Sequence, residues 1–306
     1  MKSKSFVGKI IVFLIIVLSL SGCGEKKEKL EKYSNPVFIA EGIRRVSIEK
    51  NGKTVLDIAY EPKEYESSYE YWKIHEPYGA EAVIDTETML EFYRKLEKLD
   101  KRVVSEYPAG TVEELKKAKS KITLEYCRAD KEESNSYEEN ADSIATLLIS
   151  GGIKDGFYYA AYEEDLGTIY QVPESDIDEI LKINTFNLIL KISTVVPVNT
   201  VAQVIMDADG ETYKWDPEKE KDSALYQELQ GILIKEEIKT KKQNEGEALL
   251  KIQFIRNKKE MPDMILEYRS YDDVYASVSV NGKENFLVDK KEVEFLKEKI
   301  KLYGKK

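Results

Sequence analysis

The only imidazole in the chain belongs to His75, which stands next to Glu76 and three residues after Trp72. A histidine beside a carboxylate suits a general base with an orienting acid. No nucleophile or oxyanion-stabilising loop occurs nearby in the sequence. We therefore interpret His75 as a surface histidine and Trp72 as a core residue of one half-buried strand. Both remain weak candidates for a ligand-binding surface.

Carboxylates are the second group that could do chemistry. Acidic residues gather at 138–142 and 163–165, but neither stretch has the alternating register with a central glycine that a calcium loop needs. We predict solvated loops, no bound metal and no cofactor, since one histidine and two cysteines are also too few for a His/Cys cluster. An acid pair for a hydrolase could come from Glu76, Asp85, Glu163 and Asp165.

Tyrosine is the third group, with twenty copies in the chain. Several of them could form an aromatic surface for sugars or peptides, with Tyr158 and Tyr159 as the main candidates. Aromatic residues also suit a pleated, half-buried strand, so the pattern leaves both interpretations open. The tyrosines concerned are Tyr60, Tyr65, Tyr69, Tyr71, Tyr158, Tyr159 and Tyr162.

The N-terminus resembles a bacterial lipoprotein signal. Three lysines precede an apolar run at 10–20, whose eleven residues rise about 16 Å as a helix, too short to cross a hydrocarbon core of about 30 Å. The next residues, Leu20, Ser21, Gly22 and Cys23, resemble the lipobox. The resemblance implies that residues 1–22 are a cleaved signal peptide and that the Cys23 thiol carries lipid.

Cleavage would change the charge of the protein. The whole chain has a formal charge of −10, and removal of three lysines leaves 44 basic against 57 acidic side chains, or −13. Such a body is unsuited to non-specific nucleic-acid binding. We expect residues 23–40 to form the acylated cysteine and a charged tether. Cys127, left without a disulfide partner, is expected to be a small buried hydrophobe.

An internal repeat organises the remaining residues. Tyr159-Ala160 matches Tyr275-Ala276 at an offset of 116, and the segment 46–55 matches 204–213 at an offset of 158. The first copy is therefore about 42 residues longer inside. We predict two related modules, residues 41–190 and 191–306.

Each predicted module has the same order of elements. A hairpin with an Asn-Gly or Asp-Gly turn (51–52 and 209–210) comes first, followed by an amphipathic helix, several strands and a closing helix. Asp85 or Thr86, Asp222 or Ser223, and Asp289 are the candidate helix caps. Short connections predict an α+β fold of mainly antiparallel sheet with packed helices, and the apolar stretch 185–200 predicts a packed connection between the modules.

The chain also resembles a bacterial family known as domain of unknown function 4340. The resemblance covers residues 44–210, with the C-terminal third as a degenerate second copy. The segment 106–120 departs from the family pattern. The motifs that carry the resemblance are Val-Ser-Ile-Glu-Lys-Asn-Gly-Lys (46–53), Trp-Lys-Ile-His-Glu-Pro (72–77), Arg-Val-Val-Ser-Glu (102–106), Gly-Phe-Tyr-Tyr-Ala (156–160) and Ile-Tyr-Gln-Val-Pro-Glu-Ser-Asp-Ile-Asp-Glu-Ile-Leu (169–181).

The resemblance implies an exported or membrane-tethered protein, in some members associated with ABC-type transport, and no established catalytic residues. We expect a non-enzymatic lipoprotein on the extracytoplasmic side of the cell membrane. It would be a binding or accessory component whose partners are the membrane, through its lipid anchor, and envelope or ABC-transporter proteins. The alternative is a cell-surface hydrolase that uses paired carboxylates.

Overall fold

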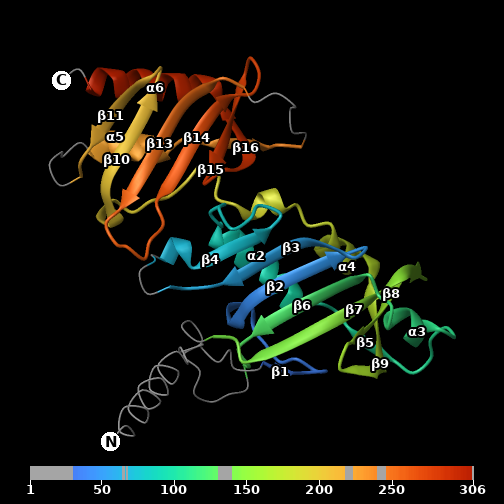
Figure 1. The fold of residues 1–306 in the computed structure, drawn as a ribbon. Helices are drawn as coiled ribbons and strands as arrows, with labels where there is room; N and C mark the ends of the chain where they lie inside the picture. Colours follow the sequence, from blue (N-terminus) through green and yellow to red (C-terminus); the bar gives the residue numbers. More distant parts are fainter. Residues whose placement is uncertain are drawn as a thin grey trace, which may run out of the picture.

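The structure is a computed structural model that describes residues 30–63, 66, 68–129, 140–217, 223–239 and 246–304. Two α+β modules follow one another along the chain, each with an antiparallel sheet that packs against helices (Figure 1). The predicted fold class is confirmed. Within the described part of the chain, no helix is both long enough and apolar enough to cross a membrane.

The first module contains a sheet with spatial order β4-β3-β2-β6-β7-β8-β9-β5. Its strands are β2 (Ile43–Lys50), β3 (Lys53–Tyr60), β4 (Trp72–Glu76), β5 (Arg102–Val104), β6 (Ser120–Tyr126), β7 (Ser143–Lys154), β8 (Phe157–Tyr162) and β9 (Asp165–Pro173). Its helices are α2 (Thr86–Glu97), α3 (Thr111–Leu115) and α4 (Glu174–Leu181), with short 3-10 turns η1 (Ala40–Gly42) and η2 (Ser68–Glu70).

The second module has the order β11-β10-β13-β14-β15-β16-β12. Its strands are β10 (Val201–Ala208), β11 (Glu211–Trp215), β12 (Ile234–Glu237), β13 (Ala248–Arg256), β14 (Met264–Ser270), β15 (Tyr275–Val280) and β16 (Lys283–Asp289). Its helices are α5 (Ser223–Gln230) and α6 (Lys290–Tyr303).

The two sheets repeat the same strand order. The path β3-β2-β6-β7-β8-β9-β5 of the first corresponds, strand for strand, to β11-β10-β13-β14-β15-β16-β12 of the second. The two matching hairpins turn at Asn51-Gly52 and Asp209-Gly210, and all four residues have positive φ, as a type I′ turn requires. The internal repeat is therefore a structural repeat. Among the described strands and α-helices, β1 (Glu31–Lys32), β4 and α3 belong to the first module alone.

Two of the predicted helix caps, Asp85 and Asp289, are present in the structure. Asp85 caps α2, since its Oδ1 accepts hydrogen bonds from the backbone N–H groups of Glu87 and Thr88 at 3.1 and 3.2 Å. Asp289 caps α6 through Lys291 N–H at 2.9 Å. Asp222 lies outside the described residues. These caps satisfy backbone donors that the first helical turn leaves without a partner.

The core of the first module lies on both faces of its sheet. Alternate side chains of β7, Leu147 and Ile149, belong to the main core, whereas Leu148 belongs to a smaller cluster on the opposite face. Leu115 of α3 joins this smaller cluster. The main core continues into the second module without a break in the cluster of buried side chains.

The chain before the first module corrects the predicted tether. Residues Glu31–Lys32 form strand β1, which pairs in parallel with β7 at Ser143 and Ile144. Strand β8 pairs with β7 only from Leu147 onward, so the backbone groups of these two β7 residues are open for β1. Further along, Ala40 is fully buried. The tether prediction for residues 23–40 is thus wrong from Glu31 onward, and residues 23–29 lie outside the described part.

The connection between the modules is packed, as predicted. Its residues Leu188, Ile189 and Val196 are buried. Ile189 forms an antiparallel bridge with Ile84 of the first module, and Ile192 forms one with Leu233 of the second. The connection therefore contacts both modules through backbone hydrogen bonds, which limits their relative movement.

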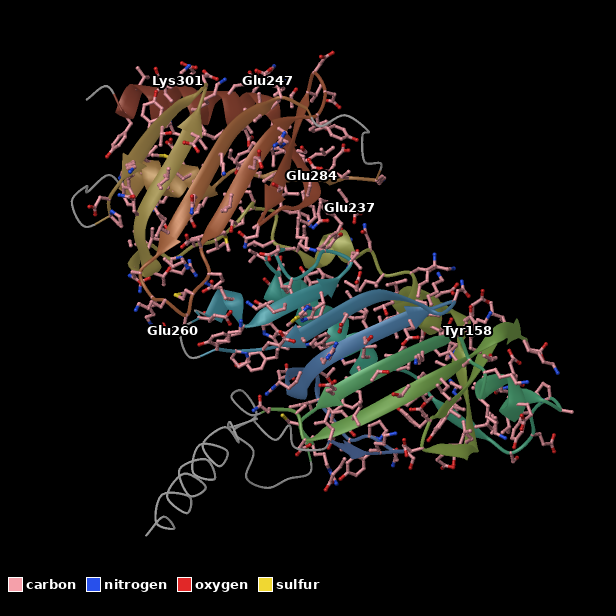
Figure 2. All side chains as sticks on the ribbon, in the orientation of Figure 1. Tyr158, Glu237, Glu247, Glu260, Glu284 and Lys301 are labelled. Atoms are coloured by element: carbon pink, nitrogen blue, oxygen red, sulfur yellow. The ribbon has the colours of Figure 1, made fainter. Side chains whose placement is uncertain are left out.

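Tyr78 provides a further contact between the modules. Its ring lies 4.9 Å from that of Phe286, its hydroxyl donates to Glu237 at 2.8 Å, and its carbonyl accepts from Asn285 Nδ2 at 2.9 Å. Burial raises the pKa of the Tyr78 hydroxyl, although a hydrogen bond with Thr185 opposes the shift. Figure 2 shows Glu237 and Glu284 at this junction.

Candidate functional site

A pocket of about 270 Å³ lies between the two modules. The first module contributes β4, residues 80–83 after it, and four residues before it: Glu61, Lys63, Glu66 and Glu70. The second contributes the end of β13, the loop to β14 and the turn after β15, while residues 194–195 of the connection complete the wall. Because β4 has no counterpart in the second module, the pocket is built where the two copies differ.

Arg256 is the most buried charge in this pocket. It is the last residue of β13, and its side chain is 3% exposed. Its Nη2 donates to Glu70 Oε1 of the first module at 2.6 Å, while its Nε and Nη1 are buried and find no hydrogen-bond partner among the described residues. A buried guanidinium with unmet donors is costly unless another group supplies acceptors. Arg256 is therefore a natural contact for something that enters the pocket.

Glu66, in the same pocket, has a buried oxygen that lacks a hydrogen-bond donor among the described residues. Its side chain is 8% exposed, and its Oε1 accepts from Lys73 Nζ at 3.1 Å. Its other oxygen, Oε2, is buried and has no hydrogen-bond partner within the described part of the chain. A carboxylate oxygen in this state can accept a hydrogen bond from an incoming donor.

His75 lies in the same pocket, where its Nε2 is 3.1 Å from Glu61 Oε1. Its side chain is 35% exposed, which agrees with the interpretation of a surface histidine on a half-buried strand. The carboxylate beside the ring is that of Glu61, so Glu76 is not the partner that a base with an orienting acid would need. Trp72 packs between Tyr60 and Tyr93, with ring centroids 5.1 and 5.9 Å away, as a core residue does.

Glu81 completes the charged lining. Burial raises the pKa of its carboxyl, and a hydrogen bond from Asn281 Nδ2 at 3.1 Å partly offsets this effect, as do Lys73 and Lys283. Asn281 belongs to the second module, so this bond also spans the pocket. Each module thus contributes polar groups that reach the other.

The structure separates the other predicted ligand-binding residues from this pocket. Tyr158 and Tyr159 lie on β8, and four strands (β3, β2, β6 and β7) stand between β8 and β4. At about 4.8 Å per strand, this is a separation of roughly 24 Å. Figure 2 shows Tyr158 in the part of the first module that is remote from the second.

The two tyrosines also fail to form one surface. Tyr158 donates to Asp178 at 3.3 Å, and its pKa is raised, first by burial and then by that carboxylate. Tyr159 belongs to the cluster of α3 on the other face of the sheet, and Tyr162 is buried in the main core. Tyr65 and the side chain of Tyr69 lie outside the described part. A continuous tyrosine surface is not formed by the described residues.

The carboxylates considered for a hydrolase are dispersed. Asp85 is occupied as a helix cap, and Asp165 accepts bonds from Gly167 N–H and Thr168 Oγ1 at 3.0 and 2.7 Å. These bonds hold the pKa of Asp165 below its usual value. Glu76 is on β4, whereas Glu163 is at the β8–β9 turn. Among the described residues, no group of three His, Cys, Asp or Glu side chains could hold a metal ion.

Of the two cysteines, only Cys127 lies within the described residues. Cys127 is buried and not in a disulfide, with its Sγ 3.5 Å from the carbonyl of Asn140, as expected for a small core residue. Cys23 and the other lipobox residues, Leu20, Ser21 and Gly22, lie outside the described residues. Their prediction rests on the sequence, as does that for the acidic residues Glu138 and Glu139.

Sequence reasoning missed Arg256, Glu70 and Glu66. One pattern could have found Arg256: the strand Ala248–Arg256 alternates, and its buried positions Leu250, Ile252 and Phe254 place residue 256 on the same inward face. A charged residue at an inward strand position predicts a buried ion pair or a binding site. No comparable pattern marks Glu66 or Glu70.

Comparisons with known proteins identified no related protein. No protein-family model, no curated protein and no solved structure matches this chain. The resemblance to domain of unknown function 4340 stays a prediction.

Proposed function

We propose that this protein is a lipid-anchored extracytoplasmic lipoprotein that acts by binding, as an accessory or ligand-binding component of a cell-envelope or ABC-type transport system. The observation that carries the binding role is the pocket between the modules, with its buried Arg256, two of whose nitrogen atoms have no partner among the described residues. The lipobox at Leu20 to Cys23 supports the anchor.

The pocket favours binding over catalysis for a geometric reason. Its charged side chains are mostly held in pairs, Arg256 with Glu70, Lys73 with Glu66 and His75 with Glu61. Paired groups recognise and orient an occupant, whereas general acid–base work needs a group that is free to exchange its proton with the substrate. The alternative of a carboxylate-dependent hydrolase has no support in the positions of the four carboxylates on which it was based.

The anchor would keep this body close to the membrane. Residue 30 already lies beside β1, which pairs with the first sheet. Seven Cα steps separate Cys23 from residue 30, and at about 3.5 Å each they span at most about 25 Å. An acidic body on so short a connection depends on its acyl chains for attachment, because anionic lipid repels it.

The anchor is tested by membrane fractionation of cells that express Cys23→Ala. We expect the variant to leave the carbonate-washed membrane fraction and to lose the lipid mass increment of the mature N-terminus. Cys127→Ala, which removes the other thiol, is the matched control and should remain in the membrane. Persistence of Cys23→Ala in washed membranes would contradict the anchor.

The accessory role is tested by purification of the full-length protein from detergent-solubilised membranes. We expect a permease or ATPase subunit to co-purify with the wild-type protein and to be lost when the membranes are first washed with high salt. Recovery of the lipoprotein alone, at salt concentrations that preserve other membrane complexes, would count against a transport role.

A further inference from the structure

We propose that the pocket between the modules binds a small zwitterionic solute of the α-amino acid type, whose carboxylate contacts Arg256 and whose ammonium group contacts Glu66. This inference rests on the proposed binding function and names the class of its ligand.

The carboxylate end follows from Arg256. A guanidinium keeps its five donors at every physiological pH, and here only Nη2 is occupied, by Glu70. Nε and Nη1 are buried and have no partner among the described residues, and Arg256 is one of the residues that line the pocket. A carboxylate offers the lone pairs these donors require and forms charge-assisted hydrogen bonds, which are the strongest available to arginine.

The ammonium end follows from Glu66. Its buried Oε2 lacks a donor within the described part of the chain. The neighbouring Lys73 is already bound to Oε1 at 3.1 Å, and Lys63 is 3.9 Å from that same oxygen. A ligand ammonium would supply the missing donor. The described lining of the pocket therefore includes a paired cation with two nitrogen atoms that lack acceptors and a paired anion with one oxygen that lacks a donor. A single zwitterion supplies the acceptor and the donor together.

The overall charge of the lining points to the same class. The acidic residues of the lining are Glu61, Glu66, Glu70 and Glu81, and the basic ones are Arg256, Lys63, Lys73 and His75. The opposite charges nearly cancel, so a ligand with a large net charge of either sign would gain little from the field of the pocket. A ligand with no net charge but two charged ends gains from both local groups.

The size and the apolar wall limit the ligand further. At ~30 Å³ per water molecule, 270 Å³ corresponds to about nine waters, or a solute of about ten non-hydrogen atoms. The second module contributes Met261, Pro262 and Met264 to the wall. Thioether side chains adapt to different shapes, so we expect the site to accept several apolar side chains with modest selectivity.

The test is calorimetric titration of the full-length lipidated protein in detergent micelles. The probes are L-leucine, 4-methylpentanoate, which lacks its amino group, and 3-methylbutylamine, which lacks its carboxylate. L-methionine and L-valine test the tolerance for other tails. We expect the amino acids to bind and both leucine analogues to bind at least 10-fold more weakly, because each leaves one buried group of the pocket unmet.

Two conservative variants connect the binding to the named residues. Arg256→Lys keeps the charge but removes the guanidinium donors, and should weaken L-leucine binding about 10- to 100-fold. Glu66→Gln should weaken L-leucine but leave 4-methylpentanoate unchanged. Arg269→Lys, in the same module but outside the pocket lining, is the matched control and should bind as the wild type does.

Three outcomes would overturn the inference. If 4-methylpentanoate binds as tightly as L-leucine, the site takes a simple carboxylate, and the proposed binding function still stands. If L-leucine binds equally to Arg256→Lys, the site is elsewhere. If none of the probes binds the wild-type protein, the ligand class is wrong, whereas the accessory role is judged separately by co-purification.

Discussion

The ion pair between Arg256 and Glu70 should contribute much of the coupling between the two modules. Replacement of Glu70 by alanine removes the only carboxylate that the described residues place against the buried guanidinium of Arg256, at 2.6 Å. The charge of Arg256 then stays buried without a partner. The Glu70→Ala variant is therefore a direct probe of how firmly the modules are held together.

The size of the effect follows from burial. Two unit charges about 4 Å apart attract each other by about 4 kcal/mol at an effective dielectric constant of 20. Loss of one member of a buried pair costs about 3–5 kcal/mol, because the remaining charge keeps its desolvation penalty. Since the Glu70 side chain is 16% exposed, water can reach part of the site. We expect the free energy of unfolding to fall by about 3 kcal/mol.

The assay is urea unfolding followed by tryptophan fluorescence, because Trp72 and Trp215 place one probe in each module. The matched control is Glu298→Ala, which breaks the exposed pair of Glu298 with Lys301 at 2.9 Å. Exposed pairs contribute little, so the control midpoint should remain at the wild-type value.

A double variant separates the ion pair from other effects of the substitution. Arg256→Met together with Glu70→Ala removes the stranded charge, so it should be more stable than Glu70→Ala alone. Unfolding of Glu70→Ala at the same urea concentration as Glu298→Ala would refute a costly buried charge at Arg256. So would a double variant in which Arg256→Met adds its full cost to that of Glu70→Ala.

Two further predictions concern the second module. Phe286 is 4% exposed in the contact between the modules, so Phe286→Ala should lower the free energy of unfolding by about 3–4 kcal/mol. Phe295 is 64% exposed, so Phe295→Ala should change it little. Equal urea midpoints for the two variants would contradict the packing of Phe286 between the modules. The pKa of Asp209 is held below its usual value by hydrogen bonds from Lys301 and Lys297. The stabilisation from a depressed pKa is fully present above the unfolded-state pKa of about 4. It is lost as the pH falls from there through the lower pKa of the folded state. Asp209→Asn should therefore melt below the wild type at pH 7 and approach it in acid, and a constant difference from pH 7 to the acid limit would exclude the linkage.

Much of the fold could be predicted because its signals are local. Alternation of apolar residues along β13 and the positive-φ turns at Asn51-Gly52 and Asp209-Gly210 act within a few residues of chain. The cap of α2 by Asp85 is equally local. The repeat was visible because the two copies keep these local patterns at constant offsets, and the strand orders of the two sheets agree with it.

Strand β1 could not be predicted from the sequence, which suggested a tether at these residues. Residues 31–32 are charged and exposed, so their own side chains carry no strand pattern. They become a strand because β8 leaves the backbone of Ser143 and Ile144 open on one side of β7. That opening depends on where β8 ends relative to β7, which no short stretch of sequence encodes.

The sequence alone determined the two α+β modules, the helix caps and the buried state of Cys127, since each depends on neighbouring residues or on hydrophobic periodicity, and it alone carries the prediction of a signal segment. Only the tertiary structure decided the candidate site. Arg256, Glu70 and Glu66 come from distant parts of the chain, and Arg256 and Glu70 meet only because the second module docks beside β4. It also placed Glu61, fourteen residues away in the sequence, against His75, because facing segments bring together side chains that are distant along the chain.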